Sequence, residues 1–180
     1  MRVRIHPQDA AHEREIAASR AGAAELDRLI QGHAAPEQFL VCYTAGAASL
    51  MLKPGVDALF PEDDFPVIEF LKALKVLPRG PRAGAAIIAA GGFDRIAVAA
   101  GSAAEAEVSA HAIAGTLAPL EPRASADDIR ERLSGAARIA ALLVSQKRIH
   151  AAAIGLRGRG RIAGPVNPDL LIRFGVSAFL

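Results

Sequence analysis

Residues 85–100 read AAIIAAGGFDRIAVAA, two short apolar runs separated by GGFD at 91–94. Short apolar runs with branched side chains, bounded by turn residues, are typical of buried β-strands. Glycine adopts positive φ angles without steric penalty, so the Gly-Gly pair favours a tight turn. The stretch therefore predicts a β-hairpin with strands at 85–90 and 95–100.

The same pattern of paired apolar runs occurs twice more, with a short alternating strand at 2–6 before them. Apolar spacing and capping residues predict helices between the runs; for example, Ser102 and Ser125 each precede an acidic residue by three positions, as in a capping box. The further hairpins are expected at 39–53 and 148–163, and the helices at 9–32, 65–76, 102–117 and 125–146.

A helix followed by a hairpin, three times over, favours helices layered on one face of the sheet. Turns of two to four residues join antiparallel strands, since parallel strands need longer crossovers. The sequence thus predicts a single α+β domain, residues 1–180, with two layers: helices packed on one face of a largely antiparallel sheet built from helix-hairpin units.

Composition excludes several classes of protein. With 52% hydrophobic and 22% charged residues and one Cys, the chain is not a disordered, disulfide-rich or collagen-like sequence. Alanine accounts for 40 of the 180 residues, and this abundance of small apolar side chains suggests surface shared with another subunit, so a homo-oligomer is expected. The sequence has no signal-like apolar segment and no membrane-length apolar run, which predicts a cytoplasmic location.

Charge is nearly balanced overall but uneven along the chain. The net charge of +2 disfavours nucleic acid and membrane surfaces as partners. From Glu121 onward, however, ten basic side chains stand against five acidic ones. An anion-binding site is therefore expected late in the chain.

The sharpest candidate for such a site is residues 155–164, GLRGRGRIAG. In an extended strand, Arg157, Arg159 and Arg161 would share one face and Gly158 and Gly160 the other. Arginine forks pair with phosphate or carboxylate groups, and glycine lets a ligand approach the backbone closely. A solvated hairpin turn and a contact between subunits are the alternatives. The glycine spacing does not fit a dinucleotide fingerprint, and the chain has no P-loop motif.

Ser102 is a second candidate, because a helix N-terminus offers free backbone N–H groups to an anion. The alternative is that Ser102 only caps its own helix. If the third hairpin packs beside the second, Ser102 and the arginines could face one cleft.

Metal and nucleophile chemistry have weaker support. Asp9, His12 and Glu13 share one face of an expected helix, but without a specific metal-binding motif. Cys42 lies in an apolar run, where a buried and inert thiol is expected. The acids at 62–64 precede a helix and are expected to be solvated. No metal site is predicted, and any cofactor is left open.

These features favour a small-molecule-binding protein or enzyme subunit that recognises an anionic metabolite or cofactor through the Gly/Arg loop, at a subunit interface. The alternative is a non-catalytic assembly subunit that docks a protein partner through its Ala-rich and Arg-rich surfaces. The sequence leaves open whether the protein is an enzyme.

Overall fold

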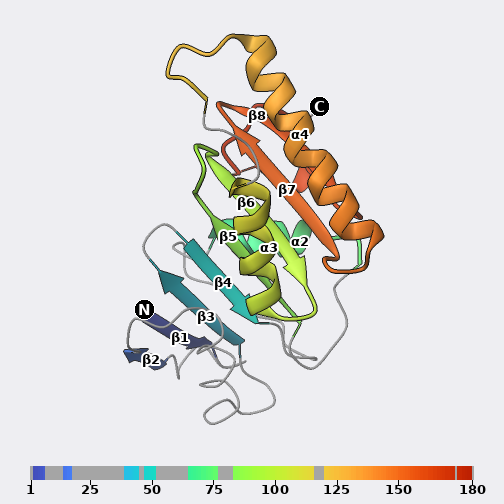
Figure 1. The fold of residues 1–180 in the computed structure, drawn as a ribbon. Helices are drawn as coiled ribbons and strands as arrows, with labels where there is room; N and C mark the ends of the chain where they lie inside the picture. Colours follow the sequence, from blue (N-terminus) through green and yellow to red (C-terminus); the bar gives the residue numbers. More distant parts are fainter. Residues whose placement is uncertain are drawn as a thin grey trace.

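The computed structural model describes residues 2–6, 14–17, 39–44, 47–51, 65–76, 83–115, 120–172 and 174–179. Its strands form one sheet in the order β2-β1-β3-β4-β5-β6-β7-β8-β9 (Figure 1). Neighbouring strands are antiparallel except β8 and β9, which run parallel. The strands are β1 (Arg2–His6), β2 (Arg14–Ala17), β3 (Phe39–Thr44), β4 (Ala47–Met51), β5 (Gly84–Ile88), β6 (Arg95–Ala100), β7 (Ala151–Leu156), β8 (Arg159–Ala163) and β9 (Ala178–Phe179). With helices beside this sheet, the α+β class is confirmed.

The described α-helices lie on both faces of the sheet. α3 (Ala103–Gly115) and α4 (Ala126–Ser145) pack on one face, and α2 (Phe65–Ala73) lies on the other (Figure 1). The short helix η3 (Pro168–Leu170) contacts α2. This arrangement corrects the expected packing of all helices on one face. The reason is that β5 and β7 are buried along their whole length, so apolar side chains on both faces need cover.

The two faces of the central strands differ in side-chain size. Under α3 and α4, β6 presents Ile96 and Val98, which join one buried cluster with Ile154 of β7. On the opposite face β6 and β7 present alanines, and the buried rings of Phe70 and Phe174 pack in the same cluster as these alanines. The small side chains of these strands thus leave room for two aromatic rings.

Part of the helix expected at 9–32 is a strand instead. Residues Arg14–Ala17 form β2, which pairs with β1 so that Ile16 lies opposite Val3 and Glu15 opposite Arg4. Matching apolar and opposite-charge positions across two antiparallel strands stabilise the pair. Cross-strand pairing therefore prevails over helical spacing here, and the other residues of the expected helix lie outside the described part.

The start of α4 matches the capping box read from the sequence. The Ser125 hydroxyl accepts a hydrogen bond from the Asp128 amide at 3.1 Å, and the Asp128 carboxylate accepts one from the Ser125 amide at 2.8 Å. The Ser125 hydroxyl also donates to this carboxylate at 2.7 Å. These bonds favour the ionised form and hold the pKa of Asp128 below its usual 3.8.

We expect Ser125→Ala to raise the pKa of Asp128 toward 3.8. A carboxyl whose folded pKa is depressed stabilises the fold above its unfolded pKa, and this contribution is lost as pH falls through the folded value. The measurement is the Asp128 carboxyl ¹³C shift followed by NMR between pH 6 and pH 2, in wild type and variant. A wild-type midpoint at or above 3.8 would contradict the capping account.

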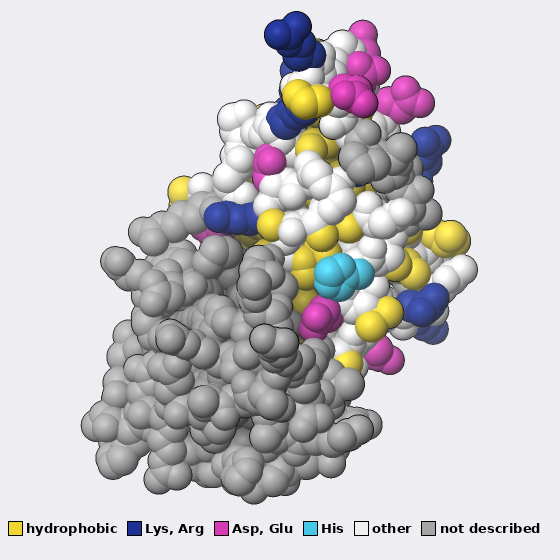
Figure 2. All heavy atoms as spheres, turned by 60° about the vertical axis from the view of Figure 1, so that its left-hand side comes forward, with side chains coloured by type: hydrophobic (Ala, Val, Ile, Leu, Met, Phe, Trp, Pro, Cys, Tyr) yellow, Lys and Arg dark blue, Asp and Glu magenta, His cyan; other side chains and the backbone are white. Residues whose placement is uncertain are grey.

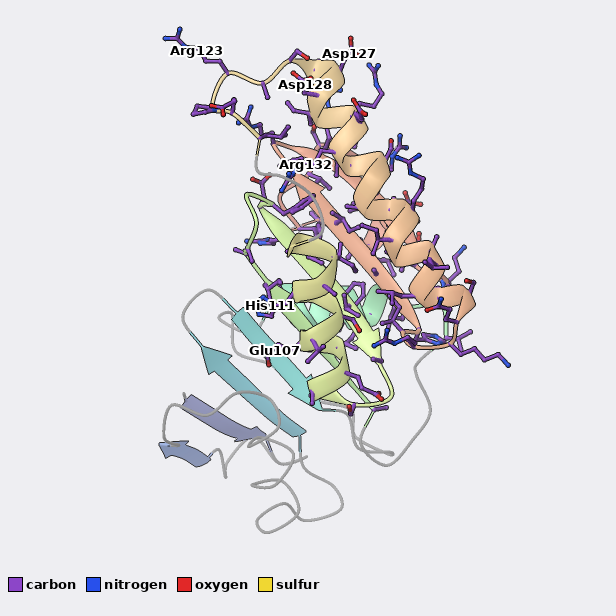
Figure 3. The ribbon with its side chains drawn as sticks, in the orientation of Figure 1. Glu107, His111, Arg123, Asp127, Asp128 and Arg132 are labelled. Carbon is purple, nitrogen blue, oxygen red and sulfur yellow. The ribbon has the colours of Figure 1, made fainter. Side chains whose placement is uncertain are left out.

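The β5–β6 turn packs against both helices of its face. Gly91 has φ +60°, and a Cβ built on it would stand 2.5 Å from the Ala114 carbonyl oxygen of α3. From α4, Arg132 (labelled in Figure 3) donates from its Nη2 to the Gly91 carbonyl. Its guanidinium carbon lies 4.7 Å from the centre of the Phe93 ring. Arg132 thereby joins α4 to the hairpin.

Arg132 is 5% exposed. Burial lowers its pKa, because the charged guanidinium loses hydration. Its Nε has no hydrogen-bond partner among the residues that the structure describes. The Gly91 carbonyl and the Phe93 ring both contact this side chain in the interior.

Candidate functional site

The Gly/Arg segment forms a tight hairpin between β7 and β8. Arg157 and Gly158 occupy the turn with φ angles of 49° and 75°, as in a two-residue type I′ connection. Arg157 thus lies in the turn and not on an extended strand with the other two arginines. The expectation that Arg157, Arg159 and Arg161 share one strand face is therefore wrong for Arg157. Positive φ is uncommon for a residue with a Cβ, so the sequence alone did not indicate that the turn lies at this arginine.

Arg159 and Arg161 do lie on one face of β8. They stand opposite Leu156 and Ile154 of β7, whose side chains belong to the buried cluster under α3 and α4, and directly opposed residues share a face. Gly160 faces the other side, where a Cβ would stand 2.6 Å from the Phe179 ring. Both arginines are half-buried.

The polar groups of the turn are engaged within the chain. Arg157 Nη2 donates to the Glu121 carbonyl at 2.7 Å, and the Gly158 amide donates to the Asp94 carboxylate at 3.4 Å. The Gly158 carbonyl accepts from both the amide and the hydroxyl of Ser177. The Gly158 amide is therefore not free to bind an anion. The nearby Asp94 carboxylate would also repel one.

Ser102 lies at the opposite end of the sheet from these arginines. β6 and β7 pair with Arg95 opposite Gly155 and Ala99 opposite Ala151. Ser102 follows the Ala99 end, whereas the Gly/Arg turn follows the Gly155 end. At about 3.3 Å per residue, the strand length separating them is roughly 17 Å. The structure does not bring Ser102 and the arginines into one cleft.

Ser102 itself caps α3, since its hydroxyl accepts from the Glu105 amide at 3.1 Å. Beside this helix start is a pocket of about 450 Å³, which we call the α3 pocket. Its lining comes from the first turns of α3 and from the connection between α4 and β7: Gly101, Ala104, Glu105, Val108, Ser109, Lys147 and Arg148.

The two cations of the α3 pocket were not singled out from the sequence. The amides of Lys147 and Arg148 donate to the carbonyls of Val144 and Leu143, which fixes them at the end of α4. The amide of His150 then bonds the Ala99 carbonyl at 2.7 Å and brings this connection beside the end of β6. Proximity to α3 therefore depends on strand pairing and not on spacing along the chain.

Among the described residues, no acidic side chain forms an ion pair with Lys147 or Arg148. Between residues that the structure describes, the one ion pair joins Arg130 and Asp127 on α4. Both of these side chains are exposed, and Asp127 is labelled in Figure 3. Lys147 and Arg148 are exposed as well, so both remain open to an anion.

No family model, curated protein or solved structure matches this chain.

Other chemistry considered from the sequence falls partly outside the described residues. This holds for Asp9, His12 and Glu13, for the acids at 62–64 and for the side chain of Cys42. Within the described ranges, no three His, Cys, Asp or Glu side chains are grouped to hold a metal. The described helices include none with the length and apolar character needed to cross a membrane.

Proposed function

We propose that the protein binds a small ligand in the α3 pocket through an anionic phosphate or carboxylate group of that ligand. The observation that carries this proposal is that Lys147 and Arg148, two consecutive cations without an ion pair in the described part, line one hollow. The proposal keeps the anionic ligand inferred from the sequence and moves its site from the Gly/Arg loop. Whether a reaction follows binding is left open.

Size and chemistry support this site. Small-molecule pockets commonly enclose about 300 to 1,000 Å³, a range that includes the α3 pocket. The Arg148 guanidinium can pair with two oxygens of one anion, and the Lys147 ammonium adds a compact second charge. Ser102 contributes by fixing the start of α3 beside the pocket.

Thermal unfolding with inorganic phosphate tests the proposal. A ligand at 100 times its Kd stabilises the fold by about 2.7 kcal/mol, which raises the Tm of a chain this size by roughly 5 to 10 °C. The double change Lys147→Ala and Arg148→Ala should remove most of this rise. The rise should also shrink with added salt, because exposed charges are screened.

Arg159→Ala combined with Arg161→Ala is the matched control, since it removes the same charge at the other end of the sheet. We expect it to leave the phosphate-dependent rise unchanged. If it abolishes the rise while the Lys147 and Arg148 variant keeps it, the anion site is on β8 and the pocket proposal is wrong. No rise in wild type with phosphate, citrate or a small carboxylate such as 4-methylpentanoate would also contradict the proposal.

A second candidate function is docking of an acidic protein partner on β8. It is favoured by the position of Arg159 and Arg161, half-buried on one strand face without an ion pair to any described residue. Under this alternative, phosphate stabilises neither wild type nor variants. A homo-oligomer in the cytoplasm stays a prediction under both candidates, and native mass spectrometry of the purified protein would report the subunit number and any retained ligand.

A further inference from the structure

The α3 pocket is lined by charges of both signs. Lys147 and Arg148 stand on the α4–β7 connection, and Glu105 stands in the first turn of α3. No ion pair of 4.0 Å or less joins Glu105 to either cation in the described structure. The pocket therefore holds separated opposite charges that do not neutralise each other by direct contact.

The Glu105 carboxylate lies back over the start of α3. A Cβ built on Gly101 would stand 3.1 Å from Glu105 Oε2. A carboxylate at this position interacts favourably with the positive end of the helix dipole, and it repels a second negative charge nearby. A ligand that carries negative charge alone thus gains from the cations and loses against Glu105.

The same pocket has an apolar wall. Val108 is 63% exposed and lines the pocket together with Ala104. On the face shown in Figure 2, hydrophobic side chains are interspersed with charged and polar ones. A ligand with an apolar body would remove the exposed Val108 surface from water, and this burial is favourable.

We infer that the ligand of the α3 pocket is a zwitterion with an apolar body, of the class of free apolar α-amino acids. Its carboxylate pairs with Lys147 and Arg148, its ammonium group with Glu105, and its side chain covers Val108. This inference rests on the proposed function, because it assumes that the two cations bind a carboxylate.

The test compares binding of leucine with that of analogues that each lack one group. 4-Methylpentanoate lacks the ammonium, 3-methylbutylamine lacks the carboxylate, and glycine lacks the apolar body. By calorimetry or NMR titration we expect leucine to bind the wild-type protein at least tenfold more tightly than each analogue. Glu105→Gln should reduce leucine affinity to that of 4-methylpentanoate and leave the affinity for 4-methylpentanoate unchanged or raise it.

Glu107→Gln is the matched control. Glu107 lies on α3 two residues later (Figure 3) and is not part of the pocket lining, so leucine affinity should be unchanged in this variant. Glutamine is also accepted at the capping-box position of Glu105, so both variants keep the helix start.

Two outcomes would overturn the inference and leave the proposed function standing: equal affinity for leucine and 4-methylpentanoate with no effect of Glu105→Gln, or binding of phosphate without binding of leucine. Failure of leucine, 4-methylpentanoate and phosphate alike would overturn the inference and the proposed function together. The two failures are therefore distinguishable.

Discussion

Gly91→Ala is expected to lower the free energy of unfolding by about 3 kcal/mol or more, and Gly92→Ala by about 1 to 2 kcal/mol. Both glycines have positive φ, +60° and +78°, a conformation that costs an L-residue roughly 1 to 2 kcal/mol. At Gly91 a Cβ would also meet the carbonyl oxygen and carbon of Ala114 at 2.5 and 3.0 Å, whereas at Gly92 it meets nothing within 4 Å.

The contacted atoms at Gly91 are backbone atoms of α3, so they move only with the helix. The pair of variants thus separates the cost of the φ angle from the cost of the close approach. Urea unfolding followed by circular dichroism, with linear extrapolation to zero denaturant, measures both. Equal losses in the two variants would show that the turn does not contact α3 as described.

Arg132→Ala is expected to destabilise the protein by about 2 to 4 kcal/mol. The change removes a charged donor from the Gly91 carbonyl, the contact with Phe93 and most of a buried side chain; losing such a bond costs about 1 to 3 kcal/mol and truncation adds to it. Arg130→Ala is the matched control, since it removes an exposed ion pair worth at most about 1 kcal/mol.

Arg132→Met separates packing from charge in the same unfolding experiment. Methionine fills much of the space and leaves no buried Nε without a partner, and apolar replacement of a buried charge is often tolerated. We expect it to recover at least half of the loss seen with alanine. A loss with Arg132→Ala no larger than that with Arg130→Ala would contradict the role assigned to Arg132.

Local signals were sufficient for several elements of the fold. Ser125 and Asp128 predicted the start of α4, and the Gly91-Gly92 pair predicted the turn between β5 and β6, because caps and positive φ angles depend on nearby residues. The placement of the helices on the two faces of the sheet did not depend on such local signals. Alanine is compatible with either face of a sheet, so the pattern did not show that α2 covers the side opposite α3 and α4.

The candidate site shows the same limit. Spacing correctly gave the alternation of Arg159 and Gly160, but it did not give the φ angles that place Arg157 in the turn. Lys147 and Arg148 adjoin α3 because β7 pairs with β6, a contact that no spacing rule provides. A basic pair directly after a predicted helix was the available signal.

The difference in side-chain size between the two faces of β6 determines the register in which this strand pairs with its neighbours. In most half-buried strands a shift by one residue is prevented because it would turn polar side chains inward. β6 from Ile96 to Ala100 has no polar side chain to serve this purpose. A one-residue slip would instead drive Ile96 and Val98 toward the rings of Phe70 and Phe174 and leave alanines beneath α3 and α4. Volume, and not polarity, thus fixes the register of this strand.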